Sequence, residues 1–190
     1  MNNVKSYWDK SISLEQYLKV NHERIENPTN EQDASFKEYY ELGAQRMARA
    51  LKTFKKDEAL AEKLKSKNFD GKILIISEPW CGDASATVPV IHEFFKGSNE
   101  VKIFLRDSDT SLIDQYLTNG TQSIPIALIL NKDYEVIAHW GPRPKHGFEL
   151  LKKFKENPEA YSRDDFHNDL QVYYAKNKGK DALEELLDLI

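Results

Sequence analysis

The feature that most constrains the fold is an unbroken apolar run at residues 73–76, set between Gly71 and Pro79. The run reads Ile-Leu-Ile-Ile, and β-branched isoleucine favours the extended backbone of a strand. A strand with one face in water would alternate apolar and polar residues, whereas this run is apolar at every position. It therefore predicts a strand that is buried on both faces.

Strand and helix patterns alternate from about residue 70 to residue 156. The expected elements are strands at 73–76, 101–105, 126–130 and 134–140, and helices at 83–96, 112–117 and about 148–154. The polar turn at 131–133 predicts that the last two strands form a hairpin. The order β-α-β-α-β-β-α then requires a parallel first strand pair and an antiparallel last pair, which predicts an α/β fold with a mixed central sheet.

Helical patterns flank this segment on both sides. Apolar residues at helical spacing predict one long helix over about 31–55, and Gly179 interrupts a helical pattern near the end of the sequence. Cap signals precede three further helices, at Ser13 with Gln16, at Asp57, and at Ser162 with Asp165. The chain is therefore divided into an N-terminal helical extension at 1–56, an α/β core at 57–156 and a C-terminal helical extension at 157–190.

Composition argues against several classes of function. A formal charge of −4 and a pI of about 5.8 argue against nucleic acid as a partner, because phosphate binding needs a basic face. Residues 1–6 are mostly polar, unlike a secretion signal, and no apolar run approaches the ~20 residues that cross a bilayer, so no membrane association is expected.

The five histidines lack paired ligand spacing, and neither a metal nor another cofactor is expected. A single cysteine excludes an intramolecular disulfide and fits a reducing cytoplasm.

That cysteine, Cys81, follows the first predicted strand and opens the next helix. Free backbone N–H groups and the helix dipole at such a position favour a thiolate, while Gly82 leaves the sulfur open and Trp80 supplies an apolar wall. Asp83 and Glu78 would raise the thiol pKa if their carboxylates face it. The alternative is that Cys81 is a small buried hydrophobic residue, as most lone cysteines are.

The surroundings of this cysteine resemble the thioredoxin family. Residues 80–82 match the Trp-Cys-Gly start of the family's active-site signature, and Pro89 stands where the family has a proline that kinks the active-site helix. Ile124 and Pro125 match the loop whose peptide bond is cis in the family, and Gly141 matches a glycine that lines the substrate groove.

The predicted element order is also that of the thioredoxin core. The resemblance covers about residues 57–156 and implies a thioredoxin fold with helical extensions at both ends. The sequence of residues 78–83, Glu-Pro-Trp-Cys-Gly-Asp, resembles the motif of a divergent bacterial branch of thioredoxin-like proteins.

The departures from the family pattern affect the residues that serve the second, resolving sulfur of the thioredoxin active site. Ala84 replaces the resolving cysteine, Asp83 replaces the signature proline, and Ile75 stands where thioredoxin buries an aspartate that assists the second sulfur. A buried carboxylate destabilises the fold, because its charge is removed from water. Its loss together with the second sulfur that it would assist is therefore physically coherent. The sequence therefore lacks the resolving machinery as a unit.

Two hypotheses follow. In the first, the protein is a monothiol thiol–disulfide oxidoreductase whose Cys81 forms a mixed disulfide with a protein or low-molecular-weight partner, and an outside thiol resolves it. The residues expected to shape the substrate groove are Trp80, Gly82, Ile124, Pro125 and Gly141. In the second, the protein is a non-catalytic peptide- or protein-binding module with a vestigial cysteine. The sequence leaves the natural substrate and the oligomeric state open.

One further residue, Arg143, lies shortly after the groove glycine. It could face the groove and bind an acidic partner, but a surface arginine in a proline-stiffened turn is the preferred interpretation.

Overall fold

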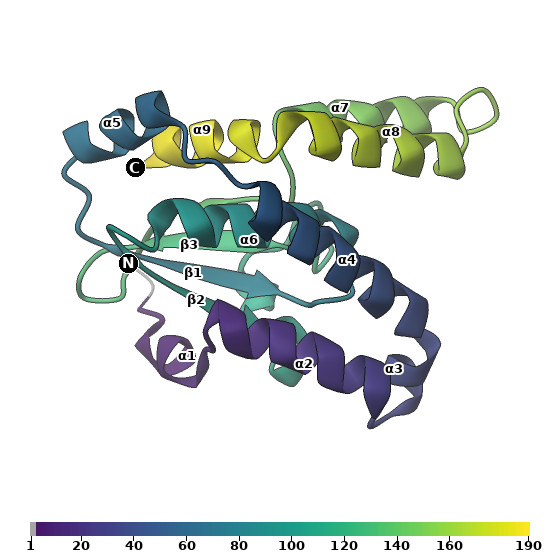
Figure 1. Ribbon diagram of the computed structural model, residues 1–190, viewed down its shortest axis with the longest axis horizontal. Helices are drawn as coiled ribbons and strands as arrows, with labels where there is room; N and C mark the ends of the chain where they lie inside the picture. Colours follow the sequence, from purple (N-terminus) through teal and green to yellow (C-terminus); the bar gives the residue numbers. More distant parts are fainter. Residues whose placement is uncertain (1–2) are drawn as a thin grey trace.

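A four-stranded mixed sheet forms the centre of the molecule (Figure 1). The computed structural model describes residues 3–190, so the first two residues of the predicted N-terminal extension lie outside the described part. The strands are β1 (Lys72–Ser77), β2 (Glu100–Leu105), β3 (Ile126–Leu130) and β4 (Val136–Trp140), in the spatial order β2-β1-β3-β4. β1 pairs in parallel with β2 and antiparallel with β3, and β3 pairs antiparallel with β4. The predicted fold class and both predicted pairings are confirmed.

Helices cover the sheet on both sides (Figure 1). The helices before β1 are α1 (Lys5–Lys10), α2 (Leu14–Glu26), α3 (Glu31–Ser35), α4 (Lys37–Thr53) and α5 (Glu58–Ser66). Those after it are α6 (Gly82–Phe95), α7 (Lys145–Glu156), α8 (Arg163–Asn177) and α9 (Lys180–Leu189), with the short 3₁₀ turns η1 (Arg106–Ser108) and η2 (Ile113–Gln115). In Figure 1, α1 and α2 lie on one side of the sheet and α6 on the other, with α5, α8 and α9 farther out on the α6 side.

The cap signals in the sequence begin the helices that they predicted. Ser13 forms a full capping box at α2, and Ser162 forms one at α8. The Asp57 side chain accepts two backbone N–H bonds at the start of α5. These bonds satisfy the first backbone N–H groups of each helix, which have no acceptor within the helix. The cap residue lies within a few positions of those groups, so the sequence pattern alone can predict it.

Two predicted helices differ from the structure. The long helix expected over 31–55 is two helices, α3 and α4, separated at Phe36, whose ring instead lies 5.3 Å from that of Trp80. The helix expected over 112–117 is the single 3₁₀ turn η2. α1 was not predicted, because it is short and has no side-chain cap. At Phe36 the break coincides with a contact to Trp80, far along the sequence, and helical periodicity does not reveal such contacts.

One hydrophobic core joins all three predicted segments. β1 supplies its centre, since Ile73, Leu74, Ile75 and Ile76 are fully buried. The same cluster takes in residues of the N-terminal helices and of α9, namely Trp8, Tyr17, Met47, Leu183, Leu186 and Leu187. A smaller second cluster lies around Phe166 in α8. Within residues 3–190, no helix is long and apolar enough to cross a membrane.

Candidate functional site

Cys81 is placed at the junction of β1 and α6. It is the N-cap residue of α6, with an extended backbone at φ −77° and ψ 125°. Its thiol is buried, with 8% of the residue exposed, and Sγ donates a hydrogen bond to the Ile124 carbonyl oxygen at 3.3 Å. The Ile124–Pro125 peptide bond beside it is cis. The structure thus brings together the cysteine and the loop that the sequence places 43 residues later.

The environment of this sulfur favours the neutral thiol. Burial raises the pKa of Cys81 to about 12, and the negative charge of Asp83 adds to the rise. Backbone N–H groups of Ala84 and Asp83 at the start of α6 lower the pKa, as a helix N-terminus is expected to do. The desolvation of the sulfur outweighs them, because a thiolate loses more than a thiol when it leaves water.

Asp83 is itself buried and held by two partners from the C-terminal half of the chain. Arg143 Nη2 donates to Oδ2 at 2.6 Å, and the Tyr174 hydroxyl donates to Oδ1 at 2.5 Å. Burial raises the pKa of the Asp83 carboxyl, while the Arg143 charge and the Tyr174 hydrogen bond lower it. The proline of the family signature is therefore replaced by the acidic member of a buried ion pair.

The interpretation of Arg143 as a surface residue is wrong. Its side chain is only 15% exposed and is directed inward to Asp83, not toward a partner in the groove. Its Nε and Nη1 atoms are buried and find no hydrogen-bond acceptor within residues 3–190. An arginine takes this position because a buried carboxylate at residue 83 needs a nearby cation.

Glu78, the other predicted modulator of the thiol, has different partners. Its carboxylate is fully buried and accepts bonds from Arg24 Nη1 at 2.7 Å and from the Asp107 backbone N–H at 2.7 Å. Its backbone carbonyl oxygen accepts the Cys81 N–H at 3.1 Å. Glu78 therefore ties α2 to the loop after β1, and Asp83 is the carboxylate that raises the thiol pKa.

Trp80 is half-buried and packs among residues outside the sheet. The Phe36 ring lies edge-on at 5.3 Å, and the Arg106 guanidinium lies 5.0 Å from the indole centroid. Its Nε1 donates to Asp107 Oδ2 at 3.3 Å. The tryptophan thus joins the cysteine loop to the N-terminal helices.

Two glycines mark close approaches at the site. A Cβ at Gly141, where φ is +123°, would lie 2.2 Å from the Pro125 carbonyl oxygen, so only glycine fits beside the cis-proline loop. A Cβ at Gly82 would lie 3.6 Å from an Arg46 nitrogen and 3.7 Å from the Gln171 amide, so α4 and α8 both reach the cysteine turn. Ile124 is only 5% exposed, so little of this residue is available to a partner.

Sequence reasoning missed three residues that complete the site: Arg24, Gln171 and Tyr174. Arg24 meets Glu78 across 54 positions and Tyr174 meets Asp83 across 91, so no local pattern links them. The sequence did contain one signal, namely Asp83 at the start of a buried helix. A buried carboxylate needs a cation or a hydroxyl group as its partner. Across the described chain, no group of three or more His, Cys, Asp or Glu side chains is placed to hold a metal ion.

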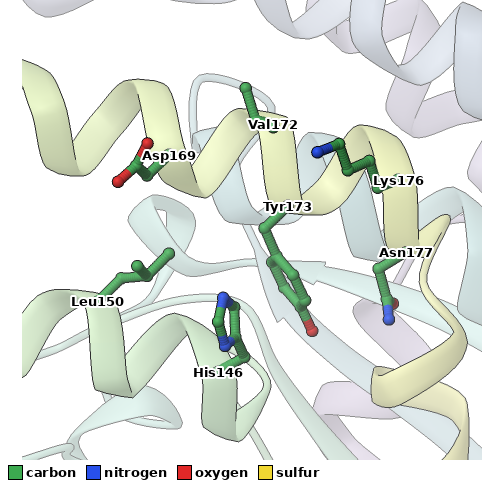
Figure 2. A pocket seen from close by; sticks show the side chains of 7 residues that line it. All are labelled: His146, Leu150, Asp169, Val172, Tyr173, Lys176 and Asn177. Atoms are coloured by element: carbon green, nitrogen blue, oxygen red, sulfur yellow. The ribbon is translucent and has the colours of Figure 1, made fainter.

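A groove lies between α7 and α8 (Figure 2). His146 and Leu150 line it from α7, and Figure 2 shows the Tyr173 side chain of α8 pointing toward His146; Asp169 and Lys176 also line the groove from α8. The His146 ring packs against Tyr173 with ring centroids 4.6 Å apart. The groove is broad and open, and its charges are mixed in sign.

The central sheet, the cysteine at the start of α6 and the cis-proline loop together define a thioredoxin-fold protein. A family model described as thioredoxin matches residues 29–155, and the chain belongs to this family. The match begins well before the core predicted at 57–156, so α3, α4 and α5 are part of the family pattern.

Two solved structures share the fold over nearly their whole lengths. A protein of unknown function from Pseudomonas aeruginosa superposes with a TM-score of 0.63 at 14% identity, over 100% of this chain and 97% of that one. An HIV epitope scaffold superposes with a TM-score of 0.64 at 13% identity, over 99% and 97%. At such identities the likeness concerns the fold alone. No curated protein matches the sequence.

Proposed function

We propose that this thioredoxin-family protein is a non-catalytic binding module in which Cys81 is kept as a protonated, buried thiol. The observation that carries the proposal is the state of the sulfur, which is buried, donates to the Ile124 carbonyl oxygen and has a pKa raised to about 12. Only a thiolate attacks a disulfide. With such a pKa, on the order of one molecule in 10⁵ carries a thiolate at neutral pH.

The surface available to a partner includes aromatic side chains next to the cysteine turn. Trp80 packs against Phe36, and Phe36 packs in turn against Tyr39, with ring centroids 5.6 Å apart. Tyr39 is 57% exposed, and Leu42, one turn further along α4, is 44% exposed. Exposed aromatic residues are enriched where proteins bind one another. We therefore assign the binding of an apolar peptide or protein segment to this aromatic surface of Phe36, Tyr39, Leu42 and Trp80.

A second candidate is a monothiol oxidoreductase, favoured by the position of Cys81 at the N-terminus of α6. Backbone N–H groups at that position stabilise a thiolate once the sulfur is exposed. The thiolate would attack a protein or low-molecular-weight disulfide and form a mixed disulfide while the other sulfur leaves as a thiolate. An outside thiol would then attack the mixed disulfide and release Cys81. For this candidate the proposed location is the reducing cytoplasm. The proposed place in the family is a divergent bacterial branch.

The pH dependence of Cys81 alkylation separates the two candidates. The binding module predicts slow reaction with iodoacetamide at neutral pH and a rate that rises about tenfold per pH unit without levelling off up to about pH 10, because the pKa is near 12. Cys81→Ser serves as the unreactive control, and alkylation of the urea-unfolded protein gives the rate of a free thiol. A midpoint below about 8.5, or a mixed disulfide trapped with glutathione disulfide at neutral pH, would overturn the binding module in favour of the oxidoreductase.

A further inference from the structure

A cavity of about 280 Å³ lies among α4, α6 and α8, next to the cysteine turn, because Arg46 and Gln171 line it and also lie close to Gly82. Residues of all three helices line it, together with the segment that follows α4. The apolar members come from all three helices, with Phe54 beyond the end of α4, Val90 in α6 and Ala175 in α8. The cavity is therefore a space between helices whose wall combines apolar side chains with polar and charged ones.

The charges around this cavity are all positive. Arg46, Arg49, Lys55 and Lys178 line it, and no acidic side chain does so. Within residues 3–190, no carboxylate forms an ion pair with any of these four side chains, although the chain as a whole carries a net charge of −4. Arg46 is also partly buried, and desolvation lowers its pKa. Arg49, Lys55 and Lys178 are exposed and stay hydrated, so Arg46 is the cation whose desolvation a bound anion would offset.

We propose that this cavity binds a small amphiphile with an anionic head, whose head lies among the four cations and whose apolar body lies against Phe54, Ala86 and Val90. A space of this size suits a short aliphatic chain with its head group and excludes a folded partner. Charge complementarity selects the head, and the apolar side chains select the tail. This inference does not depend on the proposed state of Cys81.

Titration with octanoate, followed by amide chemical shifts in the full-length protein, tests the proposal. Octanoate should bind saturably to one site and shift resonances of α4, α6 and α8. The neutral 1-octanol, which has the same chain length, should bind about tenfold more weakly or worse, because it lacks the charge-assisted bonds. Acetate, which has the head without the tail, should bind at least about a hundredfold more weakly.

Variants then locate the site. Arg46→Gln should weaken octanoate binding about tenfold, because it removes a charged donor. Ala175→Trp should abolish binding by filling the cavity, and residue 175 is exposed enough to accept a large side chain. Lys52→Gln removes an exposed positive charge from the same helix without touching the cavity and should bind octanoate as the wild type does.

The proposal fails if octanoate does not bind saturably, if 1-octanol binds as tightly, or if Arg46→Gln and Ala175→Trp both bind octanoate like the wild type. Cys81→Ser should bind octanoate unchanged. Loss of binding in that variant would overturn the claim that octanoate binding does not depend on the Cys81 thiol. Its alkylation behaviour bears only on the function proposed above, so failure of one proposal does not imply failure of the other.

Discussion

At the scale of single residues, Asp83 sets the state of the thiol beside it. Its charge raises the Cys81 pKa, whereas the Arg143 charge lowers that pKa. Asp83→Asn removes the first effect and leaves the second. We therefore expect the thiol pKa to fall in this variant, so that alkylation at a fixed pH becomes faster than in the wild type.

The same substitution should destabilise the fold by about 3–5 kcal/mol, because Arg143 would be left as a buried charge without its partner. Urea unfolding measures this loss. Asp83→Asn combined with Arg143→Met is the control, since removing both charges should recover much of the stability. A single variant as stable as the wild type would contradict the importance of the pair.

Protonation of Cys81 also makes stability depend on pH. The folded-state pKa, near 12, lies above the unfolded value of about 8.5, so the contribution of the thiol is fully present below about pH 8.5. Above that pH the unfolded chain ionises first, and stability should fall by about 1.4 kcal/mol per pH unit until the folded thiol ionises as well. The measurement is the difference in unfolding free energy between wild type and Cys81→Ser, in which the other titrating groups cancel. A difference that stays constant from about pH 8 to 11 would contradict the raised pKa.

At the scale of elements, the close packing of α4 on the cysteine loop depends on one glycine. A Cβ at Gly43 would lie 2.6 Å from the Pro79 carbonyl oxygen, and backbone on both sides leaves little room to adjust. Gly43→Ala gains about 1 kcal/mol of helix propensity but must push α4 away from the loop. We expect a net loss of about 1–2 kcal/mol and faster alkylation of Cys81, because overpacking at this contact outweighs the gain.

Gly97→Ala is the matched control, because nothing lies within 4 Å of the Cβ that it adds. It should change stability by less than about 1 kcal/mol and leave the alkylation rate unaltered. If Gly43→Ala behaves like Gly97→Ala in both measurements, α4 does not hold the cysteine loop closed.

The comparison of sequence and structure separates local from long-range information. β1, the strand pairings and the helix caps could be predicted, because each depends on residues within a few positions or on the order of elements. The place of Cys81 at the start of α6 was predictable for the same reason. The burial of the Cys81 sulfur was not predictable, because this burial depends on how α4 and α8 pack near Gly82. The inward turn of Arg143 likewise depends on Asp83, 60 positions away.

At the scale of the whole molecule, the helical extensions are part of the core and not additions to it. Tyr17 and Met47 are fully buried in the same cluster as β1, and so are Leu186 and Leu187 of α9. Burying one such side chain contributes about 1.5–3 kcal/mol, whereas a whole domain is stable by only about 5–15 kcal/mol. Losing several of them exceeds that margin.

We therefore expect that the fragment 57–156, although it contains the complete sheet, does not fold on its own. It should show little amide dispersion and no cooperative urea transition, whereas the full chain should show both. The fragment 29–155, which spans the family match, restores α4 but still lacks α9 and should also fail to unfold cooperatively. Because α9 covers β4 and α6, adding the separate peptide 161–190 to the fragment 1–160 should restore dispersion if the core is shared. A cooperative transition in 57–156 alone would instead mean that the sheet and its own helices suffice, and that the extensions serve only to cover the cysteine turn.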